Sequence, residues 1–248
     1  MNLTIDIGNT FTKIALMEKG DVVKMCRVEV LDRDCIASFI EGCEHISGAI
    51  VCSLKDVDSV LEDYLKQIAD KYLRLTPETK VPLKNLYQTP MTLGVDRMAA
   101  AVGASALFPD TNLLVVDFGT AITIDVVTSS GEFLGGNISP GAATRFRALN
   151  TFTESLPLLS LCDCKEDALQ AGLSLGRSTR EAIEKGVVEG IVLEIEGYMT
   201  RFFEQYEKNK VIFTGGDEKF FAKKFKNTIF ATCDLVMYGL NRIMEHNA

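Results

Sequence analysis

Two charged residues, Asp96 and Arg97, stand together in the stretch GVDR (residues 94–97), just before an Ala-rich segment. An Asp at such a loop can accept the proton of an attacking hydroxyl group, and a neighbouring Arg can hold an anionic acceptor or a phosphoryl group in transfer. The alternative is structural, with Asp96 capping a helix and Arg97 on its surface. GVDR therefore favours phosphoryl transfer as the chemistry to compare with the rest of the sequence.

Other catalytic motifs find little support in the sequence. It contains neither a G-x-x-x-x-G-K-[ST] phosphate loop nor a G-x-S-x-G nucleophile turn. It has only 2 histidines, so a Ser-His-Asp triad has little to draw on. The 7 cysteines show no metal or disulfide spacing, and we expect reduced, partly buried thiols.

A repeated stretch indicates where phosphates would lie. TIDIGNTFTK (residues 4–13) and VVDFGTAITIDVV (residues 115–127) align without a gap. The alignment pairs Asp6 with Asp117, Gly8 with Gly119, Thr12 with Thr123, and Gly20 with Gly131. Each copy is typical of a strand, an Asp-x-Gly turn, a second strand, a Gly-containing turn and a third strand. The pattern predicts a duplicated lobe.

The two Asp-x-Gly turns have the composition of anion-binding loops. Glycine lets the backbone approach a ligand closely, and successive N–H groups form an anion-binding concavity. Asn9, Thr10 and Thr120 add side-chain donors, and Lys13 adds a cation. The acidic Asp6 and Asp117 would repel phosphate, so we expect a cation between them and the ligand. Two such turns facing each other across a cleft would hold a nucleotide's phosphates from both sides.

Several further elements would position these residues. Apolar periodicity predicts an amphipathic helix over residues 53–75 and an Ala-rich helix from Asp96 to residue 108. The capping box Ser178-Thr-Arg-Glu181 predicts a helix that starts there and runs toward Lys208. Three glycines lie along this helix, namely Gly186, Gly190 and Gly197, which leaves open a packing or subunit interface or a simple break.

KVIFTGGDEKFFAKKF (residues 210–225) predicts a strand, a Gly-Gly turn and a helix with Asp217 as cap. The bare Gly215-Gly216 pair at a strand end would suit the flat ring of an adenosine.

The composition limits the kinds of molecule that the protein is expected to bind. The net charge is −8 and the pI is about 4.9, which disfavours a nucleic-acid surface because phosphates need a basic stripe. No apolar run approaches the ~18 residues needed to cross a bilayer, so we expect no membrane span. We expect a soluble cytoplasmic protein.

Taken in order, the motifs resemble those of the type III pantothenate kinases. They are DIGNTFTK, Tyr87 before a proline, LGVDR, VVDFGTAITIDVV, GEFLGGNISPG, the helix start at Thr179 and TGGD. The resemblance covers almost the whole chain. It implies the acetate and sugar kinase, Hsp70 and actin superfamily, with an α/β fold of two duplicated actin-like (ribonuclease H-like) lobes, residues 1–111 and 112–248, and a nucleotide cleft between them.

The resemblance also implies a reaction and its residues. ATP would phosphorylate the hydroxyl of pantothenate, the first step of coenzyme A biosynthesis, with Asp96 as the general base. The residues implied to bind ATP are Asp6, Ile7, Gly8, Asn9, Thr10, Phe11, Thr12, Lys13 and Thr120. Those implied to bind pantothenate are Tyr87, Gly94, Val95, Asp96, Arg97 and Thr179.

Cofactors and assembly follow from the same resemblance. Asp117 would hold a monovalent cation, K⁺ or NH₄⁺, which the family requires together with Mg²⁺. Thr179 would be donated by a partner subunit, which implies a homodimer with a shared active site. The segment ATRFRALN, with Arg145 and Arg147, carries more charge than we expect in the family.

Three alternatives remain open on the sequence. One is another small-molecule kinase of the superfamily, such as a sugar kinase, although the cysteine-rich zinc loop of many sugar kinases is missing. A second is a non-catalytic nucleotide-binding regulator, which the intact Asp96 and Asp117 disfavour. A third is an actin-like assembly ATPase, which the short lobes disfavour.

Overall fold

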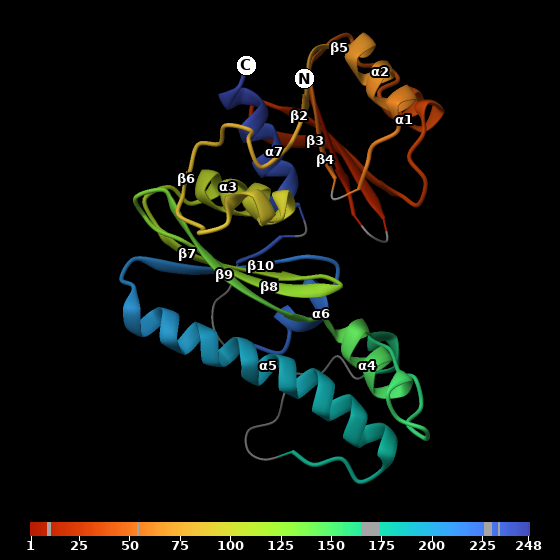
Figure 1. Cartoon of the computed structure of the whole chain (residues 1–248), viewed down its shortest axis with the longest axis vertical. Helices are drawn as coiled ribbons and strands as arrows, with labels where there is room; N and C mark the ends of the chain where they lie inside the picture. The colour runs from red at the N-terminus through yellow and green to blue at the C-terminus, as the bar shows by residue number, and fades with distance from the viewer. Residues whose placement is uncertain (9–10, 54, 165–173, 226–229, 233) are drawn as a thin grey trace. The chain divides into compact units, whose positions relative to one another are not determined.

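The computed structural model describes residues 1–8, 11–53, 55–164, 174–225, 230–232 and 234–248 (Figure 1). The chain forms two compact units. Unit 1 comprises Met1–Asp110, Val127–Gly135 and Asp234–Ala248, and unit 2 comprises Thr111–Val126 and Gly136–Cys233. The division into lobes 1–111 and 112–248 stays a prediction; the compact units place 127–135 and the C-terminal residues with the first part of the chain.

Unit 1 is built on a five-stranded sheet in the order β3-β2-β1-β4-β5. The strands are β1 (Asn2–Ile7), β2 (Thr12–Glu18), β3 (Asp21–Val28), β4 (Ile46–Ser53) and β5 (Ala69–Arg74). The β1-β2-β3 meander is antiparallel, whereas β4 and β5 join parallel to β1. The helices of the unit are α1 (Arg33–Phe39), α2 (Ser59–Ile68), α3 (Val95–Leu107) and α7 (Leu235–His246). The short strand β6 (Lys84–Asn85) and the 3-10 turn Pro90–Thr92 complete it.

The two faces of this sheet are covered by different helices, and side chains alternate between the faces along each strand. Leu3 and Ile5 of β1 are fully buried in a hydrophobic cluster with residues of α1 and α2. Thr4 points the other way and donates from Oγ1 to Met237 Sδ of α7 at 3.2 Å. Asp6 therefore lies on the face that α7 covers.

Helices α3 and α7 pack backbone to backbone. A Cβ atom at Gly239 of α7 would lie 1.8 Å from the carbonyl oxygen of Ala99, and one at Gly103 of α3 would lie 2.1 Å from that of Leu235. Only glycine fits at such an approach. The small residues of the predicted Ala-rich helix, which is confirmed as α3, thus serve to bring it against α7 (Figure 1).

The second sheet repeats the plan of the first. Its order is β11-β10-β7-β8-β9-β6, so the run β9-β8-β7-β10-β11 reproduces β3-β2-β1-β4-β5. The new strands are β7 (Asn112–Phe118), β8 (Ala121–Val127), β9 (Glu132–Pro140), β10 (Asn209–Thr214) and β11 (Phe230–Ala231). Asp6 and Asp117 are each the penultimate residue of the first strand of their repeat. The predicted duplication is confirmed.

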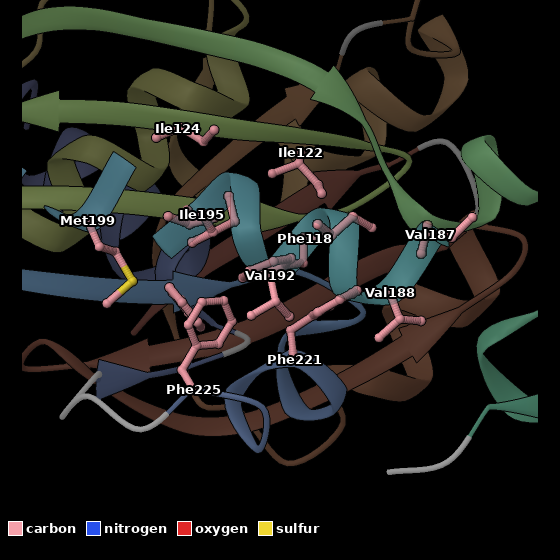
Figure 2. Close-up of a cluster of buried hydrophobic side chains, with 14 of the residues drawn as sticks. Phe118, Ile122, Ile124, Val187, Val188, Val192, Ile195, Met199, Phe221 and Phe225 are labelled. Carbon is pink, nitrogen blue, oxygen red and sulfur yellow. The ribbon is translucent and has the colours of Figure 1, made fainter. Parts of the chain in front are cut away.

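A long helix supports the core of unit 2. Helix α5 (Thr179–Gln205) crosses the sheet, and its residues Val188, Ile195 and Met199 meet Phe118 of β7 and Phe221 (Figure 2). The rings of Phe118 and Phe221 stack with centroids 4.8 Å apart. The remaining helices are α4 (Ala142–Thr151), the 3-10 turn Leu161–Asp163 and α6 (Glu218–Ala222). The prediction of a helix starting at Ser178 is confirmed.

One sequence prediction is wrong. The helix expected over residues 53–75 is confined to α2, and the chain continues from Ala69 directly into β5. Tyr72, expected on the helical face, is paired with Ala49 of β4 in a parallel ladder. Pairing with the free edge of β4 therefore determines the structure of residues 69–74 more strongly than their helical periodicity does.

Among the described residues, no helix combines the length and the apolar character that crossing a bilayer requires.

Candidate active site

In unit 1, three side chains form a row across the ends of neighbouring strands. The register pairs Asp6 of β1 with Cys52 of β4 on one side and with Lys13 of β2 on the other. Residues paired across a ladder point to the same face, so all three lie on the α7-covered face identified above. Thr12 points to the opposite face and is buried. The prediction that Lys13 brings a cation toward this strand end agrees with the register.

The surroundings of Asp6 raise the pKa of its carboxyl group above the usual value. Burial raises the pKa of Asp6 to about 6, and the negative charge of Asp96 adds to the rise. Lys13 and a hydrogen bond from Cys52 act in the opposite direction. A carboxylate whose charge is only partly compensated is the setting that a cation would stabilise.

The turn after Asp6 needs glycine. The Gly8 N–H donates to the Phe11 carbonyl at 3.2 Å, and a Cβ atom at Gly8 would lie only 2.9 Å from that oxygen. Gly8 is exposed, the Phe11 side chain is 48% exposed, and Ile7 is the last residue of β1. The predicted ATP-binding residues Asn9 and Thr10 lie outside the described residues.

Asp96 occupies the first turn of α3, and Gly94 makes room for it. Its Oδ1 accepts from the Arg97 N–H at 2.8 Å, so the carboxylate folds back over the helix start. A Cβ atom at Gly94 would lie 2.5 Å from the same Oδ1. The charge of Asp96 raises the pKa of both Asp6 and Cys52. The two predicted carboxylates, Asp6 and Asp96, are therefore close enough to interact.

Arg97 departs from the surface role that sequence left open, because its side chain is only 7% exposed. Its guanidinium lies 5.6 Å from the ring centroid of Tyr87, an arrangement that favours a cation on an aromatic face. Tyr87 is fixed in turn, because Gly135 of β9 leaves room for its ring: a Cβ there would lie 3.0 Å from Tyr87 Cδ2. The structure thus brings together Arg97 and Tyr87 from the predicted substrate set.

A pocket of about 100 Å³ lies in unit 1 beside the start of α3. Its lining is mostly apolar and comprises Leu75, Thr76, Pro77, Thr79, Val81, Asn85, Pro90, Leu93, Val95 and Met98. Val95 and Met98 are three residues apart and share a helix face that differs from the faces of Asp96 and Arg97. Of the predicted substrate residues, this pocket therefore contains only Val95.

In unit 2 the equivalent strand end carries Asp117, whose neighbour across the ladder is Thr214 of β10. The following Gly215 has a φ of +99° and packs directly on this point: a Cβ atom there would lie 2.5 Å from Asp117 Oδ1. Gly216 is exposed, with nothing within 4 Å of a Cβ atom. Glycine at position 215 thus lets the end of β10 pack closely against the Asp117 carboxylate.

The loop after Asp117 is braced by the start of α4. The Thr120 carbonyl accepts from the Gly141 N–H at 3.0 Å and from the Thr144 hydroxyl at 2.8 Å. The Thr120 residue itself is exposed. Thr179, the remaining predicted substrate residue, is exposed at the first position of α5, where the Ser178 hydroxyl accepts from the Glu181 N–H at 3.3 Å.

Sequence reasoning missed Cys52 and Gly135. Cys52 is meaningful only through its register with Asp6, and no local pattern states which residue of a later strand will stand beside an earlier one. Gly135 lies inside β9, and its contact with the Tyr87 ring is likewise not stated by any local pattern.

Two duplicated sheets of one strand order, each with an acidic residue near the end of its first strand, are the architecture of the actin-like fold. Solved structures agree. One is the activator of the 2-hydroxyisocaproyl-CoA dehydratase from Clostridium difficile, with bound ADPNP, at a TM-score of 0.57 and 13% identity over 99% of this chain and 93% of that one. Another, from Campylobacter jejuni and described as a conserved Baf family transcriptional activator, has a TM-score of 0.61 and 25% identity over 99% and 98%. The predicted fold class is confirmed.

The family follows from closer relatives. The model of the type III pantothenate kinases matches residues 2–201. A type III pantothenate kinase from Phocaeicola vulgatus is 40% identical over 247 residues, covering 100% of this chain and 99% of the relative. One from Flavobacterium johnsoniae is 37% identical over 248 residues, covering 99% and 98%. The chain belongs to the type III pantothenate kinase family.

Membership of this family identifies the reaction. The protein is a kinase that phosphorylates pantothenate in coenzyme A biosynthesis, and the resemblance read from its motifs is confirmed. As such a kinase it uses ATP, with a divalent metal ion.

Proposed function

We propose that Asp96 is the general base that accepts the proton of the pantothenate hydroxyl as this oxygen attacks the γ-phosphoryl group of ATP. The observation that carries the proposal is the position of its carboxylate, which the absent side chain of Gly94 lets fold over the first turn of α3, within electrostatic reach of Asp6. A carboxylate that orients a hydroxyl is a recurring component of phosphoryl transfer.

ATP is bound, in this proposal, by the stretch Asp6–Lys13 and by Thr120. Gly8 supports this, because it is exposed and has no side chain to keep a phosphate away, and Lys13 stands beside Asp6. Magnesium accompanies the nucleotide. It prefers oxygen ligands and is usually held through one or two carboxylates plus substrate phosphates, and the half-buried Asp6 is a suitable oxygen donor. Within the described ranges, no three His, Cys, Asp or Glu side chains gather into a metal site of their own.

Pantothenate is bound by Tyr87, Gly94, Val95, Asp96 and Arg97, with Thr179. The buried Arg97 guanidinium, held against the Tyr87 ring, gives the substrate's carboxylate or the transferring phosphoryl group a fixed positive partner.

The experiment that tests the function is a coupled ADP-release assay with purified protein, ATP, Mg²⁺ and K⁺, with and without pantothenate. ADP release that depends on pantothenate would support the function of a pantothenate kinase. Release that depends instead on a sugar would favour another small-molecule kinase, and ATP binding without turnover on any acceptor would favour a nucleotide-binding regulator.

Asp117 holds a monovalent cation, K⁺ or NH₄⁺, in this proposal. Its carboxylate oxygen is a hard ligand of the kind such ions take, and the glycine at position 215 puts no side chain against Oδ1. Asp117→Asn, which keeps the shape and removes the charge, is expected to raise the K⁺ concentration needed for half-maximal turnover roughly tenfold or more. Titration of the ADP-release rate with K⁺ at constant ionic strength measures it. An unchanged K⁺ curve would assign the cation elsewhere.

The protein acts as a cytoplasmic homodimer with a shared active site, in which Thr179 of one subunit contacts pantothenate bound to the other. The exposed side of α5 supports an interface: Leu193 is 66% exposed, and Gly186 and Gly197 have nothing within 4 Å of a Cβ atom. Gly190 differs, since Arg145 Nη1 lies 4.0 Å from its Cβ position and the same guanidinium bonds Glu194 at 2.5 Å. The helix is continuous through all three glycines, so the alternative of a break is wrong.

Subunit mixing tests the shared site. Asp96→Asn and Thr179→Ala proteins, each of low activity alone, are expected to recover roughly a quarter of wild-type turnover when unfolded and refolded together, because a mixed dimer places both changes in one site and leaves the other intact. Wild-type protein taken through the same refolding is the control. Mixing without any gain would place Thr179 in the site of its own subunit.

A further inference from the structure

We propose that Cys52 is a positioning residue for phosphoryl transfer, whose thiol holds the Asp6 carboxylate in its working orientation. Its register beside Asp6 and its nearly complete burial, at 1% exposure, carry the proposal. It goes beyond the assignment of Asp6–Lys13 to ATP, on which it rests.

The geometry leaves the thiol a defined partner. Cys52 and Asp6 are directly opposite in the parallel ladder of β4 and β1, on the face that α7 covers. As ladder neighbours on one face of the sheet, the two side chains are placed for the thiol to donate to the carboxylate. A cysteine thiol ordinarily keeps its proton at neutral pH, so Cys52 has a proton with which to donate to the carboxylate.

Such a donor has a function that burial alone does not explain. A carboxylate on a strand end can rotate about its terminal torsion, which is broad and nearly two-fold. A thiol on one side and the Lys13 ammonium on the other restrict that rotation. Outer partners that orient a ligand-binding carboxylate typically change metal affinity or activity about 10–100-fold when removed.

The test compares Cys52→Ala with Cys52→Ser. Alanine removes the donor and is expected to lower kcat about tenfold with the KM for pantothenate nearly unchanged. Serine keeps a donor at the same position and is expected to restore kcat to within about threefold of wild type. If Cys52 only fills space, the order is reversed, because a buried hydroxyl without a needed partner costs more than a methyl group. Equal rates for the two variants, or serine below alanine, would overturn the proposal.

Cys26 provides a matched control. It lies on β3 of the same sheet, paired with Ile14, and packs in the cluster on the opposite face. Cys26→Ala and Cys26→Ser are expected to leave kcat within about twofold of wild type. Differences as large as those at Cys52 would show that any cysteine change disturbs the sheet, and would overturn the specific role.

A spectroscopic readout separates the proposal from the activity itself. In ligand-free protein, the S–H stretching band lost in Cys52→Ser is expected at lower frequency than the band lost in Cys26→Ser, because donation to a charged carboxylate weakens the S–H bond. Asp6→Asn is expected to move the Cys52 band upward. A Cys52 band that coincides with that of Cys26 and ignores Asp6→Asn would contradict the hydrogen bond, whatever the turnover of the protein.

Discussion

Asp96→Asn is expected to lower kcat for pantothenate phosphorylation about a thousandfold, the middle of the range over which a general base contributes. The amide cannot accept the proton of the hydroxyl group, so the attacking oxygen must lose it to water. ATP affinity is expected to stay within about threefold of wild type, because the nucleotide is assigned to Asp6–Lys13 and Thr120. Steady-state ADP release gives kcat, and equilibrium binding of a labelled nucleotide gives the affinity.

The substitution is a clean one because the local fold does not depend on the charge. Asp96 Oδ1 accepts from the Arg97 N–H at 2.8 Å, and the carbonyl oxygen of an asparagine can accept the same bond. Asp58 supplies a matched control: it caps α2 in the same unit, its Oδ1 accepting from the Val60 N–H at 3.0 Å. Asp58→Asn is expected to leave kcat unchanged. Near-normal turnover in Asp96→Asn would show that the base assignment is wrong.

The features that could be predicted from sequence are those written in local patterns. The duplicated Asp-x-Gly turns fixed the equivalence of Asp6 and Asp117, because such turns need glycine at set positions in the chain. The Ala-rich run after GVDR and the capping box at Ser178 each predicted a helix that is present. The motif order then predicted the family, which the relatives confirm.

The features that could not be predicted depend on partners distant in the chain. Tyr72 joins a strand because the edge of β4 is available to it, although its own segment has helical periodicity. Arg97 is buried rather than on the surface because Tyr87 offers its ring, and the position of that ring depends on Gly135. Cys52 reaches Asp6 only through the parallel register. The contacts that support the site join residues distant in the chain, whereas its charged residues lie in motifs that can be recognised in the sequence.

Gly239→Ala is expected to lower the free energy of unfolding by about 3 kcal/mol or more, at the upper end of the cost of overpacking a core. The added Cβ atom would lie 1.8 Å from the carbonyl oxygen of Ala99 and 2.6 Å from its carbonyl carbon. These are backbone atoms in the middle of α3, so no side chain can rotate away to relieve the overlap. The two helices must separate, which also exposes the buried residues between them.

The consequence reaches the site through α3. Asp96 and Arg97 stand on its first turn, and α7 in turn packs on β1 and β4, where Asp6 and Cys52 lie. A displaced α3 is therefore expected to lower kcat in the fraction of Gly239→Ala protein that still folds. Urea unfolding followed by circular dichroism measures the first effect, and ADP release per folded molecule the second.

Gly190→Ala is the matched control for helix glycines. Gly190 lies in α5, outside the proposed interface, and the Arg145 Nη1 atom is 4.0 Å from its Cβ position, so alanine adds no overlap there and is expected to raise stability by about 0.5–1 kcal/mol through its better helix propensity. Opposite signs at the two positions would show that Gly239 is required for the contact between α3 and α7, not for the flexibility of a helix. Equal small effects at both would mean that the two helices can part without cost, and α3 would then not be the rigid support of Asp96 that its packing implies.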